Sequence, residues 1–548
     1  MIPIRYSQEQ FEQMSGEGFF QAAADHIDIN AEKYPDKEAY VDSQSRLTFS
    51  QAKLMADRLA LSFVDMGLKK DDRIVLQIPN VVEYFIVRSA LRKAGLIGLY
   101  TMMYLRHKEM EFAIGKAEAT GIIICPGFHN FDYAGMIDEI KPNLPSLKHV
   151  FAIRDDVPTG IISLTEMMAN PLEKKYPANY FEQTVLKPGE ISELKMTSGT
   201  TGMPKLTESY QIGSTELVGE LERRFGVTHD DIFAALAPLT GGASGGAICK
   251  GIAQRQGCKV VMIERFDTDA ALEQLQNEKV TFATGVPTMM AKMMSHLDFD
   301  KYDLSSVRAF HSSGAYLPPA LAKEAEEKMD LTILNHYGAI DIGFATSTYL
   351  DASLEARLSS VGRPMPDVTL KLIDDDGNDV PKGEVGEIVW ASSKGGTMYY
   401  RDLEATLARE ATGLTKTGDL GKQDEDGNLY IVGRKKDVII RGGQNIFPAE
   451  VESLLITHPS IMNVAVVPMP DNVMGEKACA YVVCKPGKDI TFEDITSFML
   501  EKKCAKYKLP ERLEVVDNFP MSGDGQKVMK RQLTEEVTGK LKAEGAIK

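Results

Sequence analysis

Short runs of apolar, β-branched residues alternate with helical stretches through most of the chain. The apolar runs predict buried strands at residues 73–79, 121–126, 149–153, 259–263 and 280–287. Two stretches with helical spacing, residues 50–67 and 82–95, lie on either side of the first of these strands. Repeated strand–helix units predict an α/β fold with largely parallel sheets covered by helices.

The pattern changes after about residue 350. Residues 368–380 and 427–440 read as strands with Asp-Gly turns. From about residue 445, helix, two strands and a second helix follow one another, which predicts a small α+β domain. We expect the boundary in the charged segment 433–437 and assign residues 1–435 to a large N-terminal domain and 436–548 to a C-terminal domain.

Composition narrows the class of protein. The chain has 548 residues with 43% hydrophobic and 26% charged residues, which is ordinary for a globular protein. A net charge of −16 argues against nucleic acid as a partner. No secretory signal and no run of 18 apolar residues is evident, and six scattered cysteines form no CxxC pair. We therefore expect a cytoplasmic protein with reduced thiols and no membrane span.

The segment 196–205, MTSGTTGMPK, is the most informative stretch. Its glycines permit close approach of backbone amides to an anion, its hydroxyls add donors, and Lys205 adds a positive charge. Such a loop suits a polyphosphate, although the spacing differs from that of a Walker A loop. The alternative is a flexible surface linker, but the alternating stretch 190–196 before it and the closing Pro204-Lys205 favour a defined loop.

This loop resembles the signature loop of the acyl-adenylate-forming enzymes, which include acyl-CoA synthetases, aryl-acid ligases, nonribosomal peptide adenylation domains and luciferase. The resemblance covers nearly the whole chain and includes residues 47–60 and 475–483. It implies a large α/β domain of mainly parallel sheets and a small α+β C-terminal domain that rotates about a hinge.

The resemblance also implies a nucleotide site. The turn at Ser313 would pack on adenine, Tyr337 would stack on the adenine ring, Asp419 would accept hydrogen bonds from both ribose hydroxyls, and Arg434 would contact ribose or phosphate. The implied ATP and AMP site comprises Thr197, Ser198, Gly199, Thr200, Thr201, Gly202, Lys205, Ser313, Gly314, Ala315, His336, Tyr337, Gly338, Asp419, Tyr430 and Arg434.

Other roles follow from the same resemblance. Residues 520–531 resemble the family's PxTxxGKxxKR motif, which makes Lys527 the catalytic lysine. Lys436 matches the hinge, and Gly442 and Gly443 match the glycine pair that lines the pantetheine tunnel for CoA. Asp341 would hold Mg2+ at the phosphates.

Three positions depart from the family pattern. Ile340 replaces the usual threonine, Asp341 replaces the usual glutamate, and Gln526 separates Gly525 from Lys527. These departures motivate one alternative, a non-catalytic nucleotide-binding homologue. Retention of Lys527 and the whole phosphate loop argues against that alternative.

The acyl pocket is expected around residues 238–246. Its predicted members are Leu239, Thr240, Gly241, Gly242 and Ile340. The glycines suggest room for a bulky acyl group, and Ile340 indicates an apolar pocket rather than one built for a second charge. Residues 91–112 resemble those of aryl-acid ligases, so an aryl, alicyclic or medium-chain carboxylate is expected.

The resemblance therefore predicts an acid–CoA ligase that uses ATP, Mg2+ and CoA and releases AMP and pyrophosphate. The close alternative is an adenylating enzyme that loads the phosphopantetheine of a carrier protein. Related enzymes are commonly dimers, so a homodimer is compatible with the resemblance.

Overall fold

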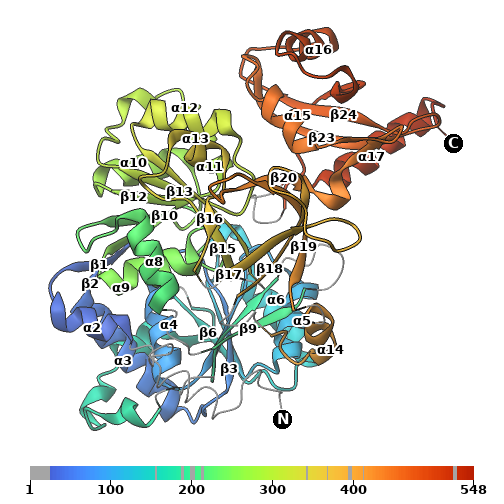
Figure 1. Cartoon of the computed structure of the whole chain (residues 1–548). Helices are drawn as coiled ribbons and strands as arrows, with labels where there is room; N and C mark the ends of the chain where they lie inside the picture. The colour runs from blue at the N-terminus through green and yellow to red at the C-terminus, as the bar shows by residue number, and fades with distance from the viewer. Residues whose placement is uncertain are drawn as a thin grey trace.

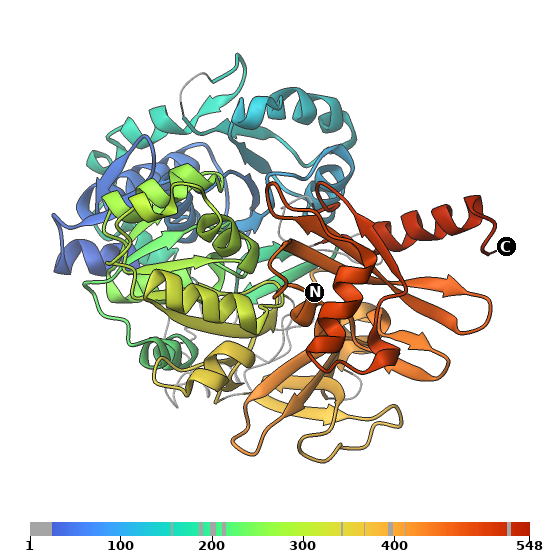
Figure 2. The ribbon, with the colours of Figure 1, turned by 90° about the horizontal axis from the view of Figure 1, so that it is seen from above.

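The computed structural model describes residues 25–154, 157–184, 186, 190–197, 204–210, 215–340, 343–366, 368–392, 398–410, 413–522 and 528–547. Most of these residues form a large α/β body, and the last hundred or so form a smaller lobe beside it (Figure 1). Seen from above, the smaller lobe stands against one side of the large body (Figure 2).

The first large sheet has nine strands in the order β16-β15-β14-β13-β12-β10-β11-β1-β2. Its central strands, from β14 to β1, pair in parallel, and only the edge strands pair antiparallel. The strands are β1 Glu38–Val41, β2 Arg46–Thr48, β10 Ile232–Ala235, β11 Lys259–Met262, β12 Phe282–Gly285, β13 Ala309–Ser312, β14 Thr332–Ala339, β15 Gly343–Ser347 and β16 Arg363–Pro364.

The second large sheet has seven strands in the order β7-β6-β5-β3-β4-β8-β9. All pairs are parallel except the β8–β9 hairpin. The strands are β3 Arg73–Gln77, β4 Ile97–Tyr100, β5 Gly121–Ile124, β6 His149–Ala152, β7 Ile162–Ser163, β8 Ile191–Met196 and β9 Leu206–Tyr210.

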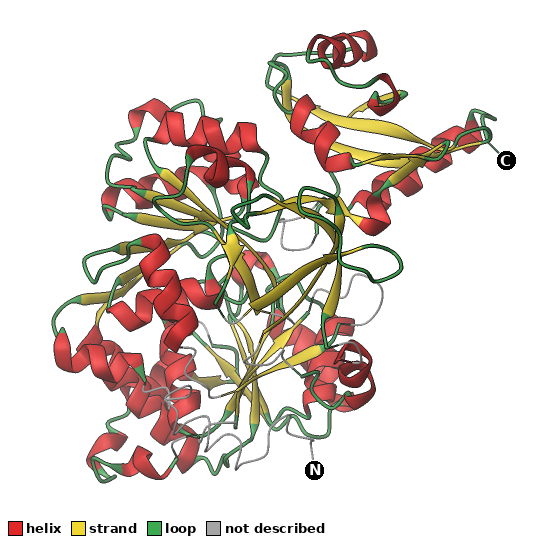
Figure 3. Cartoon of the chain, in the orientation of Figure 1, coloured by secondary structure: helices red, strands yellow, loops and turns green. Residues whose placement is uncertain are grey.

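Helices cover both large sheets (Figure 3). One core lies between the two sheets around α3, α4 and the π-helix η5, a second packs α10, α11 and α12 on the first sheet, and a third packs α5 and α6 on the second. The helices of this body are α2 His26–Lys33, α3 Phe49–Asp65, α4 Glu83–Lys93, α5 His107–Ala117, α6 Tyr133–Ile140, α7 Leu164–Ala169, α8 Thr215–Phe225, η5 Gly245–Ala253, α9 Gln254–Gln256, α10 Thr268–Asn277, α11 Pro287–Met294, α12 Pro319–Met329, α13 Leu354–Ser359 and α14 Leu403–Glu410.

A four-stranded antiparallel sheet follows in the chain and packs around the buried Trp390. Its strands are β17 Val368–Ile373, β18 Gly386–Ser392, β19 Thr415–Gln423 and β20 Leu429–Arg434. The Asp-Gly pairs at 376–377 and 426–427 lie in the connections β17–β18 and β19–β20, with both glycines at positive φ. This sheet brings β19 and β20 to the same cleft as β14.

The short helix η7 (Lys435–Asp437) leads from β20 into the smaller lobe. This lobe is a mainly antiparallel five-stranded sheet with α15 and α16 on one face and α17 on the other. The elements are β21 Ile439–Arg441, β22 Gln444–Ile446, α15 Pro448–Leu455, β23 Ile461–Asp471, β24 Gly475–Cys484, α16 Phe492–Glu501, β25 Arg512–Val515 and α17 Lys530–Ala543. Alternate residues of β23 enter the two cores, as strand geometry requires.

The fold class expected from the sequence is therefore confirmed: mainly parallel sheets flanked by helices, with a small α+β lobe at the C-terminal end. Across the part of the chain that the structure describes, no helix combines the length and the apolar character needed to span a bilayer.

One buried arginine fixes the edge of the first sheet. Arg224, on α8, donates to the carbonyls of Ser347, Arg363 and Pro364 at distances of 2.8 to 3.0 Å, and its Nε donates to Glu220 at 2.8 Å. Its side chain is 2% exposed. These bonds hold β15 and β16 in place and thereby support β14, which carries Tyr337 and Gly338.

We expect Arg224→Met to lower the thermal midpoint by several degrees, corresponding to a loss of about 3 kcal/mol. The reason is that three carbonyls and a carboxylate lose a buried, charged donor. Arg223→Met is the matched control, because Arg223 contacts the same Glu220 but is 71% exposed; its cost should stay below about 0.5 kcal/mol. Equal shifts for the two variants, measured by scanning calorimetry, would contradict this assignment.

Candidate nucleotide and acid site

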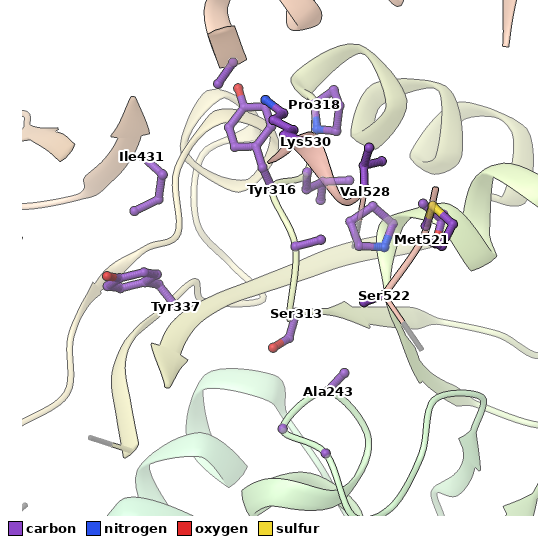
Figure 4. Close-up of a pocket in the computed structure, with 18 of the residues that line it drawn as sticks. Ala243, Ser313, Tyr316, Pro318, Tyr337, Ile431, Met521, Ser522, Val528 and Lys530 are labelled. Carbon is purple, nitrogen blue, oxygen red and sulfur yellow. The ribbon is translucent and has the colours of Figure 1, made fainter. Parts of the chain in front are cut away.

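A cavity of about 2830 Å3 opens where the smaller lobe meets the large body. It lies at the carboxyl ends of the parallel strands β4, β8, β12, β13 and β14, the edge at which open α/β sheets bind ligands. In Figure 4, Ser313 and Ala243 stand on facing sides of the hollow, Tyr337 and Ile431 lie on one flank, and Met521, Ser522 and Val528 lie on the other.

The ends of the predicted phosphate loop lie on this cavity. Thr197 N–H donates to the Lys205 carbonyl at 2.9 Å, and Lys205 N–H donates to Thr197 Oγ1 at 3.0 Å. The Lys205 ammonium lies 4.3 Å from the centre of the Tyr399 ring. Thr197 and Lys205 both line the cavity, so the two described ends of this segment, at the β8–β9 hairpin, face the cleft.

Tyr337, Asp419 and Arg434 form a connected group on the opposite flank. The Tyr337 hydroxyl donates to Asp419 Oδ2 at 2.6 Å, and Arg434 Nε donates to Asp419 Oδ1 at 3.0 Å. Burial and the neighbouring carboxylate raise the pKa of Tyr337, which keeps its hydroxyl protonated as a donor. The Asp419 carboxylate therefore links β14 to β19 and β20, and its oxygens keep lone pairs that can accept further hydrogen bonds.

Gly338 is required by the close approach of β15 to β14. A Cβ at this position would lie 2.2 Å from the Gly343 carbonyl oxygen and 3.1 Å from the Phe344 Cα. The β14–β15 pairing also shifts register between Tyr337 and Gly338. A larger residue at position 338 would push β14 away and displace Tyr337.

The turn after β13 rests on two histidines. Ser313 Oγ lies 2.9 Å from His336 Nε2, and His336 Nδ1 lies 2.6 Å from His311 Nε2. Burial lowers the pKa of His311 to about 3 and lowers that of His336 as well, so both rings are neutral at pH 7. His336 lines the cavity and positions Ser313, while Gly314 (φ 82°) and Ala315 continue the turn along the same wall.

Four of the five predicted acyl-pocket residues line the cavity: Thr240, Gly241, Gly242 and Ile340. Leu239 is fully buried and lies outside the cavity lining. Thr240 Oγ1 lies 2.8 Å from the Met102 sulfur, so its hydroxyl is engaged with the loop that follows β4. The lining continues onto η5 through Gly246, Ala247 and Lys250.

The structure places two groups of predicted residues away from the cavity lining. The Tyr430 hydroxyl donates to Asp424 at 3.0 Å, in the connection between β19 and β20, and Tyr430 does not line the cavity. Gly442 and Gly443 (φ 56° and 85°) form the two-residue turn of the β21–β22 hairpin, a geometry that favours glycine whether or not CoA binds there. Lys436, in η7, lies on the cavity wall.

Several predicted residues fall outside the described ranges: Ser198, Gly199, Thr200, Thr201, Gly202, Asp341 and Lys527. The residues that flank 523–527 are described. Met521 pairs with Val528 in an antiparallel bridge, and both line the cavity together with Ser522. Within the described ranges, no group of three or more His, Cys, Asp or Glu side chains could hold a metal ion.

Sequence reasoning did not identify two cavity-lining lysines, Lys195 on β8 and Lys250 on η5. Lys195 lies in the alternating stretch just before the phosphate loop, and Lys250 follows the glycine cluster by only four residues. That proximity was the available signal, but a lysine in such a stretch is usually solvent-exposed.

The sheet edge and the tyrosine–carboxylate–arginine group on the cavity are typical of an α/β protein that binds a nucleotide. The chain belongs to the AMP-binding enzyme family, whose model matches residues 27–418, and the AMP-binding enzyme C-terminal domain matches residues 450–526. The family resemblance noted in the sequence is thereby confirmed.

Named relatives span almost the full length of the chain. A Streptomyces salicylyl-CoA synthase / salicylate adenylyltransferase is 30% identical, covering 93% of this chain and 92% of the relative. The medium-chain fatty-acid–CoA ligase of Escherichia coli (strain K12) is 29% identical, covering 94% and 91%. The crystal structure of the anthranilate CoA ligase AuaEII with anthranoyl-AMP superimposes with a TM-score of 0.83 at 25% identity, covering 95% of this chain and 99% of the other.

Proposed function

We propose that this enzyme joins a carboxylic acid to CoA in two steps at one site, with ATP as the energy source. The acid carboxylate attacks the α-phosphorus of ATP, the bond from that phosphorus to the bridging oxygen breaks, and pyrophosphate leaves. The CoA thiol, losing its proton, then attacks the acyl carbon, the bond to AMP breaks, and the thioester and AMP are released. The observation that carries the proposal is the Tyr337–Asp419–Arg434 group, which faces the cavity that Thr197 and Lys205 also line.

Each part of the site has a task in this scheme. Asp419 accepts hydrogen bonds from the ribose hydroxyls. Tyr337 stacks on adenine beside the Ser313 turn, and Arg434 neutralises negative charge near the ribose and phosphate. The loop that begins at Thr197 and ends at Lys205 holds the phosphates. Because little covalent chemistry falls to the protein, positioning and charge neutralisation supply the rate.

Lys527 is proposed as the charge that stabilises the adenylation transition state. Its neighbours Val528 and Ser522 line the cavity, which supports this assignment. We further propose that the boundary between the two domains follows residue 435 and that residues 436–548 turn about Lys436 between the two steps. The position of η7 between the two antiparallel sheets supports this hinge.

Mg2+ is proposed to accompany the phosphates of ATP. A magnesium ion commonly uses one or two carboxylates and fills its remaining positions with phosphate oxygens and water. A single carboxylate, Asp341, together with the ATP phosphates fits that donor set. When bound, the ion would offset the charge of the leaving pyrophosphate.

The relatives favour an aryl or medium-chain acid, and Gly241 and Gly242 leave room for a broad acyl group on the cavity wall. A carrier-protein phosphopantetheine is the second candidate acceptor, since one relative is also named as an adenylyltransferase. We also propose that the enzyme is cytoplasmic and forms a homodimer.

Incubation with ATP, an activating acid and free CoA tests the acceptor. We expect stoichiometric acyl-CoA and AMP, detected by mass spectrometry and chromatography, because the proposed second step needs only the thiol. Omission of CoA should reduce AMP release by about tenfold or more, since the adenylate then stays bound. Formation of pyrophosphate and acyl-adenylate without any acyl-CoA would instead identify a carrier protein as the acceptor.

A further inference from the structure

Lys250 is a buried cation on the wall of the cavity. Its side chain projects from η5 and the residue is only 6% exposed, whereas Gly246 and Ala247, which line the cavity one turn earlier, are more exposed. Its ammonium lies 3.4 Å from the Tyr84 hydroxyl and 5.3 Å from the centre of the Tyr100 ring. The dipole of the Tyr84 hydroxyl and the face of the Tyr100 ring stabilise the ammonium, but neither group carries a negative charge.

The surroundings of Lys250 carry an excess of positive charge. Among the residues that the structure describes, Glu193 is the carboxylate that acts most strongly on it, and Glu193 is already paired with Arg88 at 2.6 Å. Lys195, two residues along β8 from Glu193, lines the same cavity. Among the described residues, neither Lys250 nor Lys195 forms an ion pair. Such a buried cation requires a counter-charge, because removing an unpaired ammonium from water is costly.

Lys250 also stands next to the predicted acyl pocket. η5 follows directly on the turn that contains Thr240, Gly241 and Gly242, and all of these residues line one cavity with Lys250. The exposure of the lining residues falls along η5 toward Lys250, which places the ammonium at the less solvent-exposed end of this wall. A ligand group that reached it would be largely removed from water.

We propose that Lys250, assisted by Lys195, binds a second anionic group of the acid, remote from the carboxylate that is adenylated. The preferred substrate class is then a dicarboxylic acid or an acid with an equivalent second anion. This inference rests on the proposed function and replaces the apolar pocket expected from the sequence. The second anion of the acid neutralises the charge of the Lys250 ammonium, because Glu193 is already paired with Arg88.

The test compares acids of matched length in acid-dependent ATP–pyrophosphate exchange, which needs no CoA. Suitable pairs are hexanoate with hexanedioate and benzoate with benzene-1,3-dicarboxylate. We expect a higher kcat/KM for the diacid of at least one pair. Lys250→Met, which keeps the side-chain length, should lower kcat/KM for that diacid by about 10- to 100-fold and change the value for its monoacid by less than about threefold.

Lys323→Met, on the exposed face of α12, is the control and should leave both values unchanged. The inference is overturned if the wild type favours the monoacid in every pair, or if Lys250→Met changes both acids equally. If no acid supports exchange, the proposed function itself fails, so the two failures are distinguishable.

A pH series on the wild type gives an independent readout should Lys250→Met fold poorly. Burial lowers the pKa of Lys250 to about 7. The charged groups that face it are Glu193 and Lys195 on β8 and Arg88 on α4, with Tyr84, Tyr100 and Cys249 as neutral neighbours.

Because the ammonium is charged below this pKa, kcat/KM for the diacid should fall relative to the monoacid as pH rises from 6 to 9, by up to about tenfold per unit above the pKa. A ratio that stays constant over this range would overturn the inference.

Discussion

Replacing Lys527 by alanine should reduce acid-dependent ATP–pyrophosphate exchange by about 10²- to 10³-fold or more. During adenylation, negative charge gathers on the attacking carboxylate and the α-phosphate, and a preorganised ammonium at that position is worth that much in rate. The effect should fall on kcat, with little change in the KM for ATP, because the charge that Lys527 offsets develops in the transition state. Exchange of labelled pyrophosphate into ATP measures it directly.

Two controls separate this role from a loss of structure. Lys506→Ala, at an exposed position in the same domain, should keep full exchange. With a synthetic acyl-adenylate and CoA, Lys527→Ala should still form acyl-CoA at a near-normal rate, since the proposed rotation removes Lys527 before thiolation. Unchanged exchange in Lys527→Ala would refute its assignment as the catalytic lysine.

Asp419→Asn should lower kcat/KM for ATP by about 10- to 100-fold. The carboxylate accepts hydrogen bonds from Tyr337 and Arg434 and is proposed to accept them from both ribose hydroxyls, so neutralising it weakens all of these charge-assisted hydrogen bonds at once. The ribose contact can be isolated with 2′-deoxy-ATP. The wild type should discriminate strongly against this analogue, and Asp419→Asn should discriminate much less.

The matched control is Asp424→Asn. Asp424 lies in the connection between the same two strands and accepts from Asn428 and Tyr430, away from the cavity. Its substitution should leave the ATP kinetics within about twofold. If Asp419→Asn retained full discrimination between ATP and its 2′-deoxy analogue, the ribose contact would have to be reassigned.

The parallel body could be predicted from sequence because its strands are buried on both faces and therefore read as continuous apolar runs. The expected strands at 121–126 and 149–153 correspond to β5 (Gly121–Ile124) and β6 (His149–Ala152). The expected strands at 121–126 and 280–287 each ran on to a proline that lies beyond the end of the observed strand. Residues 280–287 give the shorter β12 (Phe282–Gly285), because Pro287 already begins α11.

The side-chain directions in the site were harder to predict. The pairing of β19 with β20 shifts register between Leu420 and Gly421. Near this irregularity, Ile431 lines the cavity, whereas the Tyr430 hydroxyl donates to Asp424. A strand pattern with period two cannot reveal such a bulge, because a single extra residue changes which side chains share a face.

The buried lysine beside the predicted acyl pocket, Lys250, could not be predicted from the sequence for a related reason. Lys250 follows a cluster of glycines in η5, a π-helix with an irregular backbone at Gly246. Neither helical nor strand periodicity applies to that segment, so its buried face could not be assigned from sequence. Only the packing of η5 against Tyr84 and Tyr100 places the ammonium inside the molecule.

The Tyr337–Asp419–Arg434 group has a consequence for turnover. Its hydrogen bonds orient the carboxylate before any nucleotide arrives. ATP, the acyl-adenylate and AMP share the same adenosine end, so these three residues, in their proposed roles, would contact substrate, intermediate and product alike. AMP should consequently act as a competitive inhibitor against ATP, and its departure, rather than bond formation, becomes the step that can limit the rate.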